Sequence, residues 1–263
     1  MSDDACFVPE SPTRFRPTEH VGGGWNPAEQ HVAPGMGLLA HAIERDRAAR
    51  GGAGRDGDLR LARFSCEILG TIPLEPVDVE VSVLRPGRTI ELVEARLVHA
   101  GRPALIARAW LTAAYDTTSL AGTPLPPIPA PGSLPEWRMS EHWPGGFARS
   151  VTIRRREDKP GRAAFWLRPQ RDLIAGVPVS TTARLLGVVD LANGVTPRAS
   201  GDEVFSPNLD LAAHLIRQPA GEWIGCDTAV SFGPHGAGLT HTVLHDERGP
   251  LGTVSQGLTV RPR

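Results

Sequence analysis

The side chains of this 263-residue chain best suited to binding a metal or moving a proton are its nine histidines. They are scattered, and the closest pair along the sequence is His241 and His245. A zinc motif of this spacing places both imidazoles on one face of a helix, with a catalytic glutamate beside the first. No glutamate lies between His241 and His245, and the segment is expected to be a strand. The sequence therefore predicts no metal site.

Motifs for covalent catalysis and phosphate binding are also missing. There is no G-x-S-x-G elbow, and Gly22-Gly23-Gly24 has neither the lysine nor the preceding strand of a phosphate-binding loop. Cys226 adjoins Asp227, whose charge would raise the thiol pKa, and burial in the core explains this cysteine better than catalysis does. The sequence predicts no bound cofactor.

Composition indicates a globular protein of the cytoplasm. The 28 basic and 29 acidic residues give a net charge of −1, and the one dense basic run, Arg154–Arg156, is followed at once by Glu157 and Asp158, so no nucleic-acid partner is expected. Three widely spaced cysteines favour a reducing compartment. The start, Met1–Pro12, is polar and expected to be irregular, and no apolar run is long enough for a membrane span.

Any functional side chain is positioned by helices and strands, and the residue pattern of the first half predicts these elements. Residues Pro34–Glu44 are apolar around most of a helical circumference, which predicts a helix buried on nearly all sides. A glycine-rich loop is expected at Gly51–Gly54. Alternating apolar residues then predict strands at Val77–Val83, Ile90–Val98 and Ala104–Ala114.

A connector with six prolines between Pro124 and Pro135 separates this half from a second one with a similar pattern. The predicted organisation is an N-terminal domain over residues 1–115, an extended spacer over 116–140 and a C-terminal domain over 141–263. In the second half we expect a helix at Ser180–Ala192, capped by Ser180. The strands expected there are Val151–Arg155, Ala163–Leu167, Asn208–Ile216, Glu222–Ser231, Leu239–His245 and Leu251–Arg261.

This order of elements, together with three segments of the second half, resembles the double hot-dog acyl-CoA thioesterases of the medium-chain type II class and their actinobacterial relatives. The segments are Asn208-Leu209-Asp210, Gly221-Glu222-Trp223-Ile224 and Gly252-Thr253-Val254-Ser255-Gln256-Gly257. The resemblance covers nearly the whole chain. It implies an α+β double hot-dog fold, in which two antiparallel sheets each wrap a long central helix as a tandem repeat.

Carried over from that family, the catalytic residues fall on Asp210, Ser231 and Gln256. The family pattern Asp-His-Ser-Met-Trp-Phe-His is replaced here by Asp210–Ile216, which contains neither the aromatic residues nor the first histidine. The carboxylate of Asp210 would be the base, and Ser231 and Gln256 would hold the attacking water, so no covalent acyl-enzyme is needed. Each residue has a plainer interpretation: a paired carboxylate for Asp210, and solvent-facing strand positions for Ser231 and Gln256.

An oxyanion site is expected at Gly35, Met36 and Gly37, where the start of a buried helix offers N–H groups and a positive dipole end. The alternative is that the two glycines only permit tight helix packing.

The resemblance implies an acyl-CoA thioesterase of lipid metabolism, with acyl-CoA as substrate and a homodimer of four hot-dog domains as a possible assembly. A second hypothesis is a non-catalytic protein that binds acyl-CoA or an acyl carrier, suggested by the altered segment after Asp210. A hot-dog enoyl hydratase ranks lower, because the segment Gly-Asp-x-Asn-Pro-x-His is absent.

Overall fold

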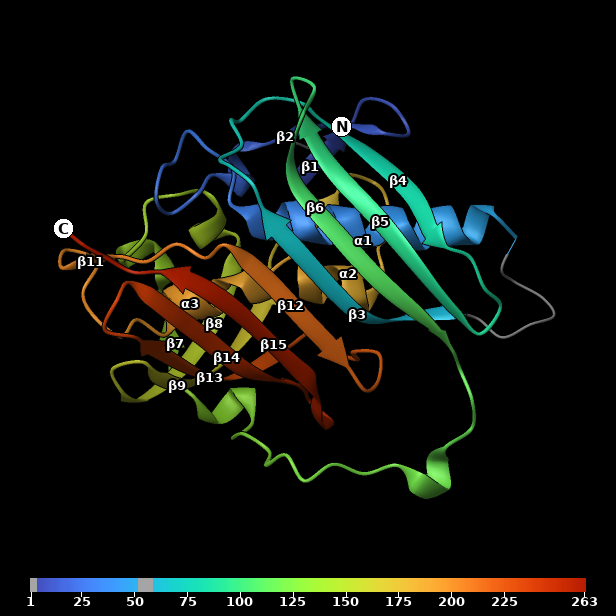
Figure 1. The fold of residues 1–263 in the computed structure, drawn as a ribbon. Coiled ribbons are helices and arrows are strands. Elements are labelled where there is room, and N and C mark those ends of the chain that lie inside the picture. The colour runs from blue at the N-terminus through green and yellow to red at the C-terminus, as the bar shows by residue number, and fades with distance from the viewer. Residues whose placement is uncertain (1–3, 52–58) are drawn as a thin grey trace.

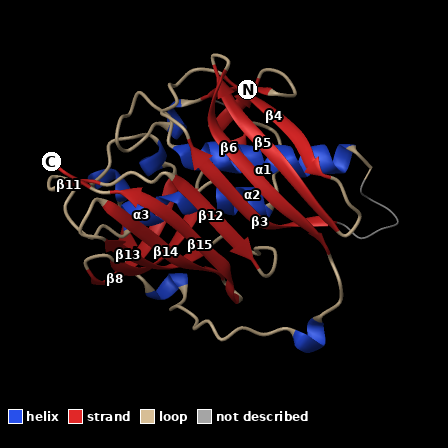
Figure 2. Cartoon of the chain, viewed as in Figure 1, coloured by secondary structure: helices blue, strands red, loops and turns tan. Residues whose placement is uncertain are grey.

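One continuous sheet contains fourteen strands, and its middle strands lie in front of the two longer helices (Figures 1 and 2). The computed structural model describes residues 4–51 and 59–263, so Gly52–Gly54 of the expected loop lie outside the described residues. The strand order is β10-β1-β2-β4-β5-β6-β3-β12-β15-β14-β13-β9-β8-β7. No helix of the described residues has the length and apolar character needed to cross a membrane.

The N-terminal half packs its strands against one long helix, α1 (Val32–Ala49). The expected helix at Pro34–Glu44 is confirmed, and it continues for five residues into the charged segment. Ten of its residues, from Ala33 to Ile43, are buried, as the all-round apolar pattern predicts. The strands are β1 (Ala5–Pro9), β2 (Arg14–Pro17), β3 (Leu59–Ile68), β4 (Val77–Arg85), β5 (Ile90–His99) and β6 (Arg102–Ala113).

The start of the chain, expected to be irregular, supplies strands β1 and β2 instead. Strand β3 was not predicted either. Its alternation of buried and exposed residues is interrupted where the register of its pairing with β6 shifts between Leu61 and Arg63.

The C-terminal half contains the six expected strands in the expected order. They are β8 (Val151–Lys159), β9 (Arg162–Pro169), β12 (Asp210–Leu215), β13 (Ile224–Phe232), β14 (Ala237–Asp246) and β15 (Gly249–Thr259). Two further strands were not predicted: β7 (Glu136–Trp137), which lies within the expected spacer, and β10 (Asp172–Ile174). Two short strands, β11 (Val204–Phe205) and β16 (Arg261–Pro262), pair separately.

The second helix differs from the prediction of one element over Ser180–Ala192. It is divided into α2 (Thr181–Leu186), the 3-10 turn η6 (Val189–Leu191) and α3 (Ala192–Val195). The break follows Gly187, a poor helix former followed by two β-branched valines. Ser180 caps α2 as predicted, because its hydroxyl accepts the Ala183 N–H at 3.0 Å.

The two halves share one sheet, whereas two separate sheets were expected. Strands β3 and β12 pair antiparallel, with Asp210 opposite Glu67 and His214 opposite Arg63. Strand β1 also crosses between the halves, because it pairs in parallel with β10. The sheet is therefore mixed, and one strand of the C-terminal half, β10, lies beside β1 at the edge formed by the N-terminal half.

The connector follows the lower side of the C-terminal half in Figure 1 and forms two 3-10 turns, η2 (Thr118–Leu120) and η3 (Pro131–Ser133). It is held to that half by side-chain hydrogen bonds. The Trp166 indole donates to the Pro129 carbonyl at 2.8 Å, and Nε2 of His245 lies 3.0 Å from the Pro126 carbonyl. These bonds dock the segment along the C-terminal half.

Candidate functional site

A buried carboxylate, Asp190, lies at the centre of the most distinctive polar cluster in the molecule. The side chain belongs to η6, is only 5 % exposed and is held by two amides. Its Oδ1 accepts hydrogen bonds from Asn208 Nδ2 at 2.6 Å and from Gln256 Nε2 at 2.8 Å. The same Gln256 nitrogen donates to the Asp190 main-chain carbonyl at 3.2 Å. One carboxylate oxygen is thus fixed, which sets the direction of the other.

Each partner of Asp190 is placed by the sheet. Gln256 is fully buried on β15, where it alternates with outward-facing Ser255 and Gly257 and points to the helix side. Asn208 lies just before β12, at an isolated bridge to Leu258. The break in the second helix brings Asp190 to these two strands.

The second carboxylate oxygen, Oδ2, faces the start of α1. It lies 3.9 Å from Nδ1 of His31, the residue that caps this helix. The same Nδ1 accepts the Ala33 N–H at 3.2 Å, so it carries a lone pair and no proton. Burial lowers the pKa of His31 to about 4, which keeps the ring neutral near pH 7. His31 and Asp190 therefore do not form an ion pair.

The unpaired N–H groups of a helix start are candidates for binding an oxyanion. At the start of α1, the His31 N–H donates to the Val21 carbonyl, the Ala33 N–H is capped, and Pro34 has no N–H. The Val32 N–H has no acceptor among the hydrogen bonds of the described residues. It is the donor left free at the positive end of α1, one residue after His31, whose Nδ1 lies 3.9 Å from Asp190 Oδ2.

Burial decides the protonation of Asp190. Desolvation raises its pKa to about 6, and the negative charge of Asp210 acts in the same direction, while the hydrogen bonds from Asn208 and Gln256 partly offset the rise. A carboxyl with this pKa is ionised at pH 7 and is a much stronger base than an exposed aspartate.

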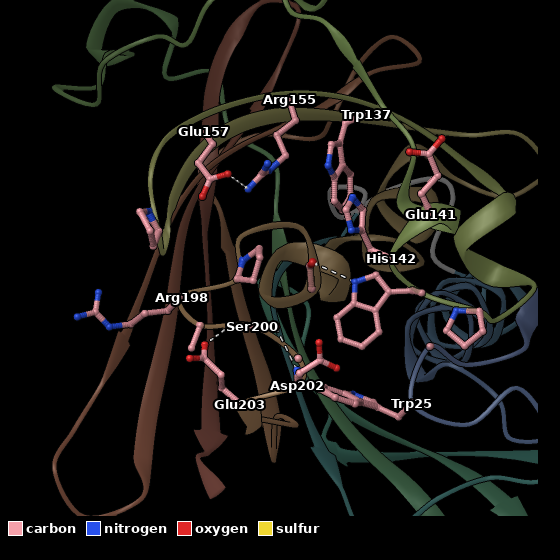
Figure 3. Close-up of a pocket in the computed structure, with 18 of the residues that line it drawn as sticks. Trp25, Trp137, Glu141, His142, Arg155, Glu157, Arg198, Ser200, Asp202 and Glu203 are labelled. Atoms are coloured by element: carbon pink, nitrogen blue, oxygen red, sulfur yellow. Dashed lines mark hydrogen bonds and ion pairs between the residues drawn. The ribbon is translucent and has the colours of Figure 1, made fainter. Parts of the chain in front are cut away.

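The cluster opens into a cavity of about 380 Å³ between the two halves. Asp190, His31 and Asn208 line it together with other polar residues: Asn26, Glu29, Gln30, Thr71, Asn193 and Arg261. Its apolar lining comes from Trp25, Val32, Ile68, Leu69, Met139, Trp143, Leu191 and Phe205. A second, more polar cavity of about 790 Å³ adjoins it across Trp25 and Trp143 (Figure 3). An apolar chamber with a few convergent polar groups is typical of a site for a small organic substrate.

Of the three catalytic residues predicted from the resemblance, the structure brings only Gln256 into this cluster. The Asp210 carboxylate lies beside Gly257 and accepts a hydrogen bond from its N–H at 2.7 Å. Gly257 and Gln256 are successive strand residues, so Asp210 lies on the opposite face of the sheet from the Gln256 side chain. Ser231 is exposed near the end of β13. The catalytic roles of these residues stay predictions, but the three do not converge on one water.

Gly35, Met36 and Gly37, the predicted oxyanion site, lie in the second turn of α1, where helical hydrogen bonding already uses the N–H groups. Both glycines are packing positions. A Cβ on Gly37 would lie 2.8 Å from the Ala183 carbonyl oxygen of α2, and one on Gly35 would lie 3.0 Å from Leu105. The start of α1 is indeed next to the cluster, but at Val32.

Sequence reasoning missed Asp190, His31 and Asn208. A signal for Asp190 was present: it is the one charged residue in the apolar run Leu185–Ala192. A lone carboxylate in a buried helix must be compensated by specific partners, and it is therefore a candidate for function. Asn208 lies in the segment Asn208-Leu209-Asp210, in which the family resemblance points to Asp210 as the base.

Comparisons with known proteins agree with this architecture. No curated protein is significantly similar to the chain in sequence. Three solved structures resemble it over nearly its whole length: the tesB protein of Mycobacterium avium subs. paratuberculosis, the acyl-CoA thioesterase II TesB2 of Mycobacterium marinum, and a hot-dog-fold protein of unknown function from Alicyclobacillus acidocaldarius. Their identities are 18 %, 15 % and 14 %, and their TM-scores 0.65, 0.65 and 0.72.

The alignments cover 97 %, 99 % and 98 % of this chain and 96 %, 96 % and 97 % of the other chains, respectively. At such identities the likeness shows the hot-dog fold. Family models decide the membership, because the acyl-CoA thioesterase N-terminal domain matches residues 21–112 and the C-terminal domain of the same family matches residues 122–260. The chain, in which the buried carboxylate of Asp190 lies near the start of α1, belongs to the acyl-CoA thioesterase family.

Proposed function

We propose that this protein hydrolyses acyl-CoA thioesters to a free acid and CoA, with Asp190 as the general base. The observation that carries the proposal is the Asp190 carboxylate, which is buried, is held by two amides and lines a mainly apolar cavity together with Val32 at the start of α1. Family membership supports the thioester class. Each half is proposed to be one hot-dog unit, and the shared sheet supports a double hot-dog arrangement of the pair.

Hydrolysis needs a water that loses a proton as it attacks the carbonyl carbon. Asp190 Oδ1 is occupied by the amides of Asn208 and Gln256, so the proton goes to Oδ2, which faces the cavity. The fixed amides also hold the carboxylate in one orientation. A general base positioned in this way increases the rate by a factor of roughly 10²–10⁴.

The attack places a negative charge on the carbonyl oxygen. The Val32 N–H and the positive end of α1 are the groups that can stabilise this oxyanion, and one such donor is worth roughly 10²–10³ in kcat. When the tetrahedral intermediate collapses, the C–S bond breaks and the proton on Asp190 Oδ2 passes to the leaving sulfur. The products are the carboxylic acid and the free thiol, and Asp190 is again ionised.

The test compares two carboxylates. Asp190→Asn keeps the size and the hydrogen-bond acceptor but removes the base, so we expect the release of free thiol from octanoyl-CoA to fall about a thousandfold. Asp210→Asn is the matched variant on the other face of the sheet, and we expect it to stay within about fivefold of wild type. A large loss of activity in Asp210→Asn with little loss in Asp190→Asn would show that Asp210 is the base.

If the wild type released no thiol from acyl-CoAs of any chain length, the proposed hydrolase activity would be ruled out. Calorimetric binding of an acyl-CoA by such a protein would then favour the non-catalytic binding role.

A further inference from the structure

His31 has a ring nitrogen that the fold leaves without a partner. Its Nδ1 accepts the Ala33 N–H at 3.2 Å, which is the N-cap bond of α1, and its main-chain N–H donates to the Val21 carbonyl at 2.7 Å. Nε2 has no hydrogen-bond partner among the described residues, and it is not among their fully buried unpaired atoms. Nε2 is therefore the ring nitrogen that is open to a ligand.

The cap bond also decides which nitrogen carries the proton. A neutral imidazole has one N–H, and the nitrogen that accepts a hydrogen bond is the one without it. Nδ1 is the acceptor in the cap, so the proton lies on Nε2. Burial lowers the pKa of His31 to about 4, which keeps the ring neutral at pH 7 with this single N–H. The open nitrogen is thus a hydrogen-bond donor.

The ring is held in place at the cavity of about 380 Å³ that Asp190 lines. His31 lines the same cavity beside Val32, and its side chain is 17 % exposed. The ring packs against that of Phe147, with centroids 4.7 Å apart and an angle of 40° between the planes. The cap bond and this ring contact together restrict the side-chain torsions. A donor that is fixed before the substrate arrives is well suited to stabilise a developing negative charge.

A neutral donor is compatible with the nearby base, whereas a cation is not. Oδ2 of Asp190 lies 3.9 Å from Nδ1 of His31, and a positive charge at that distance would lower the pKa of the carboxyl and weaken the base. The neutral ring has no such effect. It also does not compete for the proton of the water, because its Nδ1 lone pair is used by the cap and its Nε2 is already protonated. Proton transfer therefore stays with Asp190.

We propose that His31 is a further catalytic residue, whose Nε2–H donates a hydrogen bond to the carbonyl oxygen of the thioester and, with the Val32 N–H, stabilises the oxyanion. The inference rests on the proposed hydrolysis and adds a side-chain donor from the N-terminal half to the base from the C-terminal half. His31 forms no covalent bond and keeps its proton throughout. The negative charge appears on the carbonyl oxygen when the water adds, and it passes to the sulfur when the C–S bond breaks.

Two amide substitutions in the full chain separate the cap from the donor. His31→Asn places an amide oxygen near the position of Nδ1, and Asn is a preferred N-cap residue, but its side chain is too short to reach the position of Nε2. His31→Gln places an amide nitrogen near the position of Nε2 and loses the cap. Both variants lose the ring that packs on Phe147, so this loss is common to the two and does not affect their comparison.

His31→Asn should be the more stable of the two variants and the less active one. We expect its kcat for octanoyl-CoA to fall about 10²–10³-fold, the usual effect of losing one oxyanion donor. His31→Gln keeps a donor, so its kcat should stay within about tenfold of wild type, but it should unfold at a lower urea concentration than His31→Asn. His20→Asn is the matched control and should leave kcat unchanged, because the His20 side chain is 19 % exposed but lines neither cavity.

A ligand that cannot be cleaved tests the hydrogen bond itself. In the ketone analogue of octanoyl-CoA a methylene group replaces the sulfur, so the carbonyl can bind but has no thiolate to lose. The ¹³C signal of this carbonyl should move downfield on binding to the wild type, because a donor draws electron density toward the oxygen. The shift should be smaller with His31→Asn and be kept with His31→Gln. In ¹⁵N spectra of the free wild type at pH 7, His31 should have a protonated Nε2 and an unprotonated Nδ1.

Equal kcat values of wild type and His31→Asn would overturn the role, and so would a proton on Nδ1. A carbonyl shift that is the same with wild type and His31→Asn would also overturn it, because the ring would then act on the water or on packing. Failure of the proposed function has a different signature: the wild type would release no thiol from octanoyl-CoA, while the ketone analogue would still report whether His31 contacts the carbonyl.

Discussion

At the scale of single residues, the two oxygens of Asp190 have different tasks. Oδ1 is fully used by Asn208 and Gln256, and Oδ2 is left facing the cavity and the start of α1. The same burial that makes the carboxyl a stronger base also makes its charge costly. Activity and stability should therefore depend on pH in opposite directions.

The first consequence concerns the rate. The base is ionised above its pKa of about 6, so kcat/KM should rise about tenfold per pH unit below pH 6 and level off above it. Gln256→Leu removes a donor that lowers this pKa, and should move the rise to higher pH. Stopped-assay pH profiles measure both. Ser255→Ala, on the outward face next to Gln256, is the control, and a rise that stays in place in Gln256→Leu would contradict the role of the amide.

The second consequence concerns stability. The pKa of Asp190 is raised from 3.8 to about 6 on folding, so the folded state takes up a proton between these pH values, and stability falls as pH rises through about 6. Asp190→Asn has no charge to bury. We expect this variant to be more stable than wild type by about 1–3 kcal/mol at pH 8, with a smaller gain at pH 5. Urea unfolding at both pH values measures the difference, and a pH-independent difference would mean that charge burial is not its cause.

At the scale of elements, the contact between α1 and α2 depends on a glycine. A Cβ at Gly37 would lie 2.8 Å from backbone atoms of Ala183 and Gly187, which cannot rotate away. Gly37→Ala should therefore separate the helices and cost about 2–4 kcal/mol. The matched variant in the same helix is Gly35→Ala, whose Cβ meets only the methyl ends of Leu97 and Leu105.

The gain in helix propensity is the same at the two glycines, so the difference between them reports the backbone contact. Chemical denaturation followed by circular dichroism measures it. Equal stabilities of the two variants would show that the helices can move apart freely.

The sequence pattern predicted these elements unevenly. The strands β4 to β6 and β12 to β15 follow from alternation and turns, and α1 follows from its apolar circumference. Gly187 and the two valines after it disfavour a helix, but propensity alone did not predict the break, because contact with α1 and the partners that compensate Asp190 also act on this segment. The site was missed for the same reason: Asn208 and Gln256 reach Asp190 only when the second helix is broken.

The N-caps of α1 and α2 differ in the side chains that they contact. His31 caps α1 next to Asp190, and Ser180 caps α2 next to Glu44, to which it donates a hydrogen bond at 2.6 Å. Burial raises the pKa of Glu44 too. The neighbouring Thr182 hydroxyl is bonded to Gln218, and this side-chain network occupies the start of α2. The polar cluster that opens into a cavity lies at α1.

At the scale of the whole molecule, the pairing of β3 with β12 makes the halves interdependent. A fragment covering residues 116–263 would expose the β12 edge and lack α1, so we expect it to aggregate. Size-exclusion chromatography of this fragment, alone and after refolding with residues 1–115, tests the prediction. A monomeric, cooperatively unfolding fragment would show instead that the C-terminal half is an independent domain. Dimerisation of the whole chain stays a prediction from the family resemblance.

Strand β1 has a consequence for synthesis on the ribosome. Its outer edge pairs with Asp172–Ile174, more than half a chain length later, so that edge stays open while the intervening residues are translated. Contacts of such long sequence separation form slowly, and unpaired edges attract other chains. The nascent N-terminal half is thus a natural client for chaperones, and the pairing of β1 with β10 is expected to form late in assembly.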